Sequence, residues 1–448
     1  MAKLVYDETG RLLFTKEMKE EYTILFPTML PVHFGLIARI IEREGYKLEM
    51  LTTNHRNIVD EGLKYVHNDT CYPALLVIGQ MIDALESGKY DVHKVALMIT
   101  QTGGGCRASN YIHLLRKALQ KSGYGFIPVI SLSAGGLERN PGFKLGPMML
   151  DRIFYAILYG DLLMLLSNQT RPYELEAGRT DRLVDQWAAR LSGQMRGRGL
   201  LSYRKVQENY KAMIADFAAI PRTQEEKVRV GVVGEIYVKF SPLGNNNLED
   251  FLRSEGAEVV VPGLMDFLLY CIYNQLNDQT LYGGASRLRD GVMKWIYRFL
   301  VKKQLDIIQL IQAEGSFRPG GYFPHTVQLV DGYLDHGVKM GEGWLLTAEM
   351  LELIEQGTCN IVCTQPFGCL PNHIVGKGMM RIIKERNPKA NIVAVDYDPG
   401  ATRINQENRI KLMLANAHAI AQSEQEEDTG DLPMPQYEDY EELAASFR

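Results

Sequence analysis

The sequence has no excess of one charge and no long apolar run free of charged residues. Its 49 basic and 54 acidic residues give a formal net charge of -5, so no global basic field exists to hold nucleic acid or an anionic membrane. The most apolar stretch, Leu145 to Ser167, is interrupted by Asp151, Arg152 and Asp161, which predicts a buried helix rather than a membrane span. The polar start MAKLVYDETG lacks the apolar region of a secretory signal, and we expect a cytoplasmic protein.

Cysteine is scarce, and several well-known motifs are missing. Six cysteines in 448 residues indicate a reducing compartment, so each thiol is a core residue, a metal ligand or a reactive group. No C-x-x-C pair of the kind that usually marks a zinc site occurs. The sequence also lacks a Walker A loop, an H-E-x-x-H metal pair and a G-x-S-x-G nucleophile elbow. Residues 231–235 match only half of a dinucleotide fingerprint, and such a half match is more often a tight turn.

The strongest regularity is a strand–helix–strand rhythm that runs through both halves of the chain. Short apolar segments alternate with amphipathic helices, a pattern typical of parallel sheets in an α/β fold. The predicted strands cover 22–27, 46–52, 94–100, 127–132, 228–234, 258–263, 360–365 and 391–398. A basic helical stretch ends at Ile220-Pro221-Arg222, where we place a domain boundary. The predicted parts are an N-terminal α/β domain with a helical extension (1–222), a C-terminal α/β region (223–421) and an acidic tail (422–448).

Three of the cysteines occupy the same kind of position. Cys71 precedes Tyr72-Pro73 and an apolar helix, Cys106 follows three glycines after a strand, and Cys369 lies between a strand and a helix. The carboxyl ends of parallel strands, at helix N-termini, are where open α/β sheets bind ligands. Helix N-termini lower the pKa of a thiol and stabilise anions, and a thiolate-ligated iron–sulfur cluster is an anion that needs such donors.

The residues therefore favour a metal-ligand role for Cys71, Cys106 and Cys369, with zinc as the competing metal. The predicted cofactor contacts are the backbone N–H groups of Gly103, Gly104 and Gly105. Cys363 lies at the end of a strand. Cys271, in an apolar run, is more simply a core residue, and Cys359 is left open between the two roles.

Four segments resemble the 2-hydroxyacyl-CoA dehydratase superfamily, and most closely its dehydratase-related and double-cubane-cluster branch. They are NDTCYPA, TGGGCRASNY, GEIYVKFSPLGNNNLEDFL and NIVCTQPFGCLPNHIVGKGM, and the likeness extends over roughly residues 20 to 420. The resemblance implies stacked Rossmann-like domains with an iron–sulfur cluster between them. By position, Cys71 and Cys106 match the paired early ligands, Cys369 matches the late ligand, and Cys363 is the next candidate. The cofactor is then a 4Fe–4S cubane or a double-cubane 8Fe–9S cluster, the latter only if Cys271 and Cys359 also serve.

The resemblance also implies a function. We expect an oxidoreductase or lyase of an anaerobic cytoplasm, a homodimer whose cluster receives low-potential electrons from a separate ATP-dependent iron–sulfur activator. As a double-cubane-type reductase it would reduce a small molecule, and as an (R)-2-hydroxyacyl-CoA dehydratase subunit it would act on an acyl-CoA. The alternatives are a non-catalytic electron-transfer or scaffold subunit and a zinc-stabilised or metal-free binding protein. No catalytic residue is assigned from the sequence.

Overall fold

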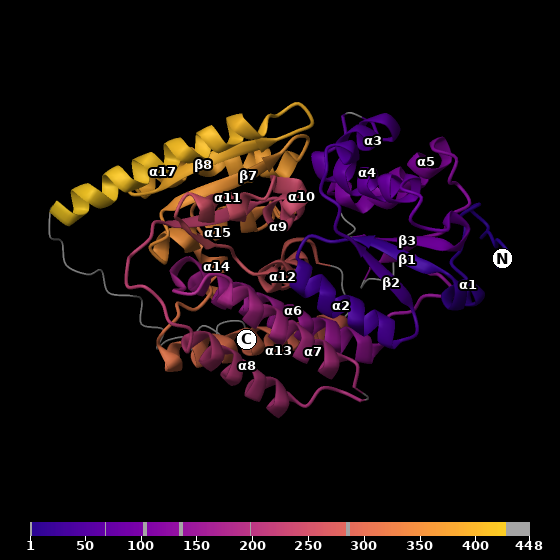
Figure 1. Cartoon of the computed structure of the whole chain (residues 1–448), viewed down its shortest axis with the longest axis horizontal. Coiled ribbons are helices and arrows are strands. Elements are labelled where there is room, and N and C mark those ends of the chain that lie inside the picture. The colour runs from indigo at the N-terminus through magenta and orange to yellow at the C-terminus, as the bar shows by residue number, and fades with distance from the viewer. Residues whose placement is uncertain are drawn as a thin grey trace.

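The fold is described from a computed structural model (Figure 1). It describes residues 2–67, 69–101, 105–133, 138–197, 199–283 and 287–426. Of the glycines predicted to contact a cofactor, Gly105 belongs to these ranges, whereas Gly103 and Gly104 lie outside the described residues.

The N-terminal half folds around a four-stranded parallel sheet with the strand order β2-β1-β3-β4. Its strands are β1 (Thr23–Pro27), β2 (Lys47–Leu51), β3 (Val95–Thr100) and β4 (Val129–Leu132). The central strand β1 pairs in parallel with β2 and β3, with Thr23 opposite Lys47 on one side and Val95 on the other. The strands predicted from the alternation of apolar segments and helices are confirmed.

Helices cover both faces of this sheet. They are α1 (Lys16–Glu21), α2 (Pro31–Arg43), α3 (Asn57–Tyr65), α4 (Tyr72–Glu86) and α5 (Tyr111–Lys121), with the 3-10 turns η1 (Val92–Lys94) and η2 (Arg107–Asn110). Because side chains alternate along a strand, Ile24 and Phe26 of β1 pack in the core that contains α2, and Leu25 packs in the core that contains α4. Figure 1 shows α2 on one face of the sheet and α3, α4 and α5 on the other.

The C-terminal half repeats the same topology. Its parallel sheet has the order β6-β5-β7-β8, formed by β5 (Arg229–Gly234), β6 (Glu258–Val260), β7 (Asn360–Pro366) and β8 (Asn391–Tyr397). Its helices are α9 (Ile236–Phe240), α10 (Pro242–Asn245), α11 (Leu248–Ser254), α14 (Phe323–Leu329), α15 (Trp344–Glu355), α16 (Met380–Arg386) and α17 (Arg403–Glu426). The fold is thus α/β, with two Rossmann-like parallel sheets, as predicted.

The segment after Cys369 is not a continuous α-helix, although the strand–helix rhythm of the sequence predicts a single helix over residues 371–386. It contains a π-helical turn η4 (Asn372–Gly376) and a 3-10 turn η5 (Lys377–Met379) before α16. π-helical turns are rare and occur often at functional sites. This one begins three residues after Cys369.

A layer of long helices runs beneath both sheets (Figure 1). It consists of α6 (Pro147–Thr170), α7 (Arg179–Met195), α8 (Tyr203–Ala218), α12 (Leu264–Tyr282) and α13 (Arg287–Glu314), with the 3-10 turn η3 (Arg171–Tyr173) after α6. The apolar stretch 145–167 is the buried helix α6, as predicted. Across the described ranges, no helix combines the length and apolar character that crossing a membrane requires.

The predicted boundary at residue 222 lies between α8 and β5. The two halves share cores across it: Leu25 and Val232 belong to one hydrophobic cluster, and Tyr210 and Leu269 belong to another. Helix α17 continues to Glu426, so residues 422–426 of the predicted tail are helical, and residues 427–448 lie outside the described residues.

Helices α3 and α4 pack backbone against backbone, and this contact sets the position of α4. A Cβ atom on Gly79 would lie 2.1 Å from the carbonyl oxygen of Ile58 and 2.9 Å from the backbone nitrogen of Gly62. We therefore expect Gly79→Ala to lower the free energy of unfolding by about 1–3 kcal/mol, the usual range for overpacking. Gly193→Ala, in an exposed part of α7 where an added Cβ meets nothing within 4 Å, should instead raise it by about 0.5–1 kcal/mol.

Urea unfolding of both glycine variants measures these two effects of opposite sign. Equal small effects at both positions would contradict the close packing of α3 on α4.

Candidate functional site

Cys71 lies where α4 begins, and this helix start contacts the C-terminal half. It is the N-cap residue of α4 and is only 5% exposed. The backbone N–H of Tyr72 donates to the carbonyl oxygen of Phe367, 2.9 Å away, in the loop that follows β7. A Cβ atom on Gly368 would lie 3.0 Å from the Cα of Cys71, and Gly368 has a φ of 72°. Glycine at position 368 thus permits the loop before Cys369 to touch the backbone of Cys71.

Cys106 lies beyond the carboxyl end of β3, at the start of a helical turn. It is the N-cap residue of η2, and its Sγ accepts a hydrogen bond from the backbone N–H of Ala108 at 3.5 Å. The side chain of Arg107 donates to the carbonyl oxygen of Asp69, two residues before Cys71. This contact joins the segments of the two early cysteines.

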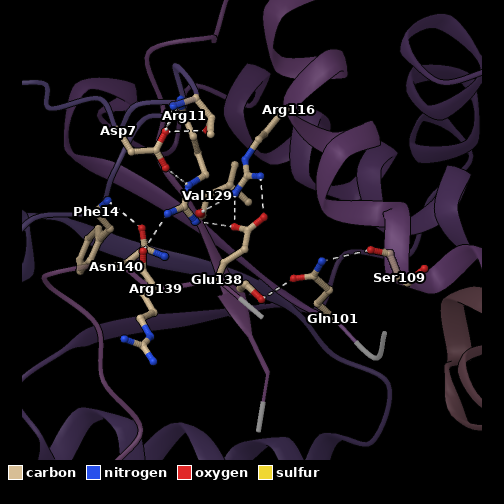
Figure 2. Close-up of polar contacts among 12 residues, drawn as sticks. Asp7, Arg11, Phe14, Gln101, Ser109, Arg116, Val129, Glu138, Arg139 and Asn140 are labelled. Atoms are coloured by element: carbon tan, nitrogen blue, oxygen red, sulfur yellow. Dashed lines mark hydrogen bonds and ion pairs between the residues drawn. The ribbon is translucent and has the colours of Figure 1, made fainter. Parts of the chain in front are cut away.

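Polar contacts fix the Cys106 segment to the first sheet. Figure 2 shows Gln101, which follows β3, donating to the carbonyl oxygen of Ser109 at 3.2 Å. The side-chain oxygen of Gln101 accepts a hydrogen bond of 2.8 Å from the hydroxyl of Ser131 in β4. The N–H of Ser109 in turn donates to the carbonyl oxygen of Cys106 at 3.2 Å. The turn after Cys106 is therefore held by both β3 and β4.

A loop of the C-terminal half lies against the Cys106 segment. It precedes α15, and a Cβ atom on Gly105 would fall 2.4 Å from the sulfur of Met340 in this loop. A Cβ atom on Gly341 would lie 3.8 Å from Sγ of Cys106 and 3.2 Å from the ring of Pro371. The segments of Cys106 and Cys369 thus meet across this loop. We call the region that Cys71, Cys106 and Cys369 share the cysteine junction.

Tyr111 is a residue of the cysteine junction that the sequence did not single out. It is the first residue of α5, and its hydroxyl lies 2.8 Å from Sγ of Cys71, within hydrogen-bond distance. Its spacing of five residues from Cys106 places it just after the predicted ligand. The hydroxyl can donate to a Cys71 thiolate, which is the kind of second interaction that tunes a metal-bound sulfur.

The pKa values of the three thiols differ from the expectation for helix N-termini. Burial raises the pKa of Cys71, although the hydroxyl of Tyr111 and the N–H of Ala74 oppose the shift. Burial likewise raises the pKa of Cys106 to about 11 and that of Cys369 above its usual range. The expected lowering is therefore wrong for the chain by itself, because loss of hydration outweighs the backbone donors. Bound metal cations reverse this balance, since a coordinating thiol is deprotonated outright.

Two buried glutamates border the cysteine junction. Glu235 directly follows β5, and its carboxylate accepts the N–H of Val238 at 2.9 Å. The carboxylate of Glu342 accepts a hydrogen bond of 3.0 Å from the backbone N–H of Ile236, the residue that follows Glu235. The charges of both glutamates contribute to raising the pKa of Cys106 and of Cys369. Burial and the neighbouring Glu342 raise the pKa of Glu235 itself to about 8, so Glu235 is largely protonated at neutral pH.

Cys363 is close to the cysteine junction but separated from Cys369 by an asparagine. Its side chain is fully buried in β7, and its thiol lies 3.7 Å from the side-chain oxygen of Asn372. The backbone N–H of the same Asn372 forms a hydrogen bond with Cys369. Asn372 also donates from its side chain to the carbonyl oxygen of Thr364 at 2.9 Å, which fixes it between the two cysteines.

The remaining two cysteines lie on other elements. Cys271 is partly buried on α12 and packed against the large helical core, and burial together with the charge of Glu342 raises its pKa to about 12. Cys359 precedes β7, whose seven residues span about 23 Å at the usual rise per residue. Cys359 therefore lies at the amino end of β7, whereas Cys369 lies beyond its carboxyl end.

The cysteine junction brings thiol groups and backbone N–H donors together. Within the described part of the chain, no group of three or more His, Cys, Asp or Glu side chains is arranged to hold one metal ion. An iron–sulfur cubane binds its thiolates through different irons, so its ligands are spaced further apart than those of a single ion. Backbone N–H groups at Cys106 and Cys369 supply the hydrogen bonds that cluster-bound sulfurs take.

Comparison of the chain with protein-family models gave no match, and comparison with curated protein sequences gave none either. The likeness to the dehydratase superfamily therefore stays a prediction, based on the four Cys-bearing and Gly-bearing segments.

The raised pKa of Glu235 gives a pH prediction. Its pKa rises from an ordinary value of 4.5 to about 8 on folding, so the folded state binds the extra proton in this interval. The stabilisation is complete below pH 4.5 and is lost as the pH rises through about 8. We expect the free energy of unfolding to fall from pH 5 to pH 8 more steeply in the wild type than in Glu235→Gln.

Urea unfolding at several pH values measures this slope. The exposed Glu20→Gln variant serves as the control and should keep the slope of the wild type. Equal slopes in the wild type and Glu235→Gln would contradict a buried, protonated Glu235.

Proposed function

We propose that the chain is an iron–sulfur oxidoreductase in which Cys71, Cys106 and Cys369 bind a 4Fe–4S cluster. The observation that carries the proposal is the meeting of three cysteine segments at the carboxyl edges of two parallel sheets. Two of these cysteines are N-cap residues, and the third precedes a π-helical turn. The position of Cys359 at the far edge of its sheet favours this cluster over a double-cubane cluster that needs all six cysteines.

The residues around the thiols would support such a cluster in three ways. Burial of Cys71 and Cys369 excludes water from their sulfurs. The hydroxyl of Tyr111 and the N–H of Ala108 donate to thiolates, which stabilises negative charge on the cluster. Glu235, protonated at neutral pH, adds no charge and holds a proton near the site of reduction. When bound, the cluster would supply low-potential electrons. The chain would hold the cluster in place, exclude water from its sulfurs and keep a proton nearby on Glu235.

Exposed apolar side chains beside Cys369 support the proposal that a partner protein docks here and delivers electrons. Phe367, Leu370 and Ile374 are 49%, 67% and 54% exposed and flank Cys369 in the sequence. Met340, which touches Gly105, is 52% exposed as well. Exposed apolar patches commonly mark protein interfaces. We infer that a separate ATP-hydrolysing activator docks on this face in an anaerobic cytoplasm. The homodimer contact would use the same face, so the activator and the second copy of the chain would bind there alternately.

For the substrate we propose a small reducible molecule. The alternative is a 2-hydroxyacyl-CoA that loses water, in which case the chain is a dehydratase subunit.

The test is reduction of the anaerobically purified protein by an activator of this superfamily with dithionite and Mg-ATP. EPR should show a reduced cluster only when ATP is present. Leu370→Asp should weaken this ATP-dependent reduction at least tenfold without loss of iron. Leu412→Asp, at an equally exposed position (66%) on α17, should leave it unchanged. Full reduction without ATP, or equal effects of the two variants, would contradict the role of the activator.

A further inference from the structure

A second candidate site lies away from the cysteines, along the outer edge of the second sheet. A partly open cavity of about 140 Å³ is lined by α6, β6, α12, α13, α15 and the 318–321 loop, and none of the six cysteines lines it. Its wall is mainly aliphatic, with Leu158, Leu162, Leu165, Ile307, Ile308 and Ile311. An apolar cavity of about 150 Å³ holds a molecule the size of benzene. The space thus suits a ligand of about six non-hydrogen atoms.

Four carboxyl groups line this cavity, and two of them are satisfied by the protein. Asp161 of α6 accepts hydrogen bonds of 2.8 Å from His33 and from the backbone N–H groups of Leu264 and Met265, which begin α12. Glu258 of β6 pairs with Arg318. Tyr173 also donates to Glu258, at 2.7 Å.

The other two carboxyl groups, Asp266 and Glu352, have uncharged partners. The amide of Gln304 donates to Asp266 at 2.6 Å, and the hydroxyl of Thr326 donates to Glu352 at 2.8 Å. Asp266 and Glu352 are 6% and 4% exposed. Burial raises the pKa of both, to about 7 for Glu352, and the charge of Glu352 adds to the shift of Asp266. Because the side chains bonded to these two groups in the described part of the chain are uncharged, ionising both at once is costly.

The backbone around the cavity also leaves room for a polar head group. β6 is the edge strand of its sheet and pairs with β5 alone, and its residues Glu258, Val259 and Val260 line the cavity. Gly321 makes room for Glu352, because a Cβ atom there would lie 1.4 Å from its Oε1. A loop residue with a side chain at this position would push the carboxyl group out of place.

We propose that this cavity binds a small primary aliphatic amine as its ammonium ion. The ammonium group, with three N–H donors, would lie between Asp266 and Glu352, and the alkyl chain would lie along the leucine and isoleucine wall. An aliphatic ammonium is charged at neutral pH, as lysine is with its pKa of about 10.4. It would supply a counter-ion, so binding would release the proton that the pair otherwise retains. The site is independent of the cysteine junction and of the proposed cluster.

The pH dependence of binding follows from the groups that surround the pair. Those facing it are Asp161 from α6, Glu258 from β6, Glu349 and Glu355 from α15, His325 from α14 and Arg318 from the 318–321 loop. Asp161, Glu258 and Glu349 have partners of their own in His33, Arg318 and Lys239. The proton released on binding is therefore the one that Asp266 and Glu352 share. Affinity for the amine should rise between about pH 6 and pH 8. Below the pKa of the pair, the rise should be up to about tenfold per pH unit.

The test is isothermal titration calorimetry of the full chain with n-butylamine, 1-butanol and butyrate. Butylamine should bind at least tenfold more tightly than 1-butanol, butyrate should not bind, and the heat should depend on the buffer because a proton is released. Asp266→Asn and Glu352→Gln should each weaken butylamine at least tenfold. Glu314→Gln, at the exposed end of α13 and outside the cavity lining, should not.

Thermal unfolding keeps the test decisive if an amide variant folds poorly. Butylamine should raise the unfolding temperature of the wild type at pH 8, and 1-butanol should do so much less. Equal affinity for butylamine and 1-butanol would show an apolar cavity without a cation site, and would overturn the proposal. Butylamine binding that survives both amide substitutions would overturn it as well.

Discussion

Alanine in place of Cys71, Cys106 or Cys369 is expected to remove most of the iron from anaerobically purified protein. Each of these thiols is a ligand in the proposed cluster, and a cubane held by two protein thiolates is too weakly bound to survive purification. Cys71 and Cys369 are buried at 5% and 7% exposure, so water does not readily replace the lost sulfur. Iron and acid-labile sulfide per chain, with the visible absorption of the cluster, measure the loss.

Alanine at three other cysteines separates a ligand effect from loss of a buried thiol. Cys271→Ala and Cys359→Ala should keep the iron, because these residues lie on α12 and at the far edge of the second sheet. Cys363→Ala should keep it too, since Asn372 lies between Cys363 and Cys369. Loss of iron in Cys363→Ala would add this residue to the ligands, as the resemblance allowed. Full iron in all three of the Cys71, Cys106 and Cys369 variants would refute the site.

Lys239→Met is expected to lower the free energy of unfolding by about 3–5 kcal/mol at neutral pH, the usual cost of breaking a buried ion pair. Nζ of Lys239 in α9 lies 2.9 Å from Oε1 of Glu349 in α15, and the two side chains are only 5% and 3% exposed. Methionine would leave Glu349 as an unpaired buried carboxylate. Because Glu349 can take up a proton, the loss should be smaller at pH 5 than at pH 8.

The double variant Lys239→Met with Glu349→Leu tests the cause of this loss. Replacing both charges by apolar side chains removes the unpaired charge and should restore most of the stability. Urea unfolding of the wild type, both single variants and the double variant forms the cycle. If the double variant is no more stable than Lys239→Met, the loss comes from packing of the lysine stem instead of the charge.

The sheets could be predicted because their strands are short, apolar and regularly separated by helices. Segments such as KVALMIT and NIVCTQ are buried on both faces, which a parallel sheet requires, and they form β3 and β7. Cys71 and Cys106 could be placed at helix starts for a similar reason, since Pro73 and the glycines before Cys106 mark such junctions. Local sequence carries this information.

Contacts between distant segments could not be predicted from the same patterns. Glu235 and Glu342 are 107 positions apart in the sequence and meet only through the backbone of Ile236. Met340 and Gly105, which also lie close together, are 235 positions apart in the sequence. The available signal for close backbone approach was the glycines at 341, 343 and 368, all of which have positive φ angles. The raised pKa of the thiols was missed because it depends on burial by both halves of the chain.

The most direct test of the central claim is an iron and acid-labile sulfide count on the anaerobically purified chain, combined with EPR. A 4Fe–4S cluster at the cysteine junction predicts about four irons and about four sulfides per chain, with an EPR signal that appears on reduction. Brown protein with these values would support the proposed function. Colourless protein that contains neither iron nor sulfide after anaerobic purification and reconstitution would contradict it.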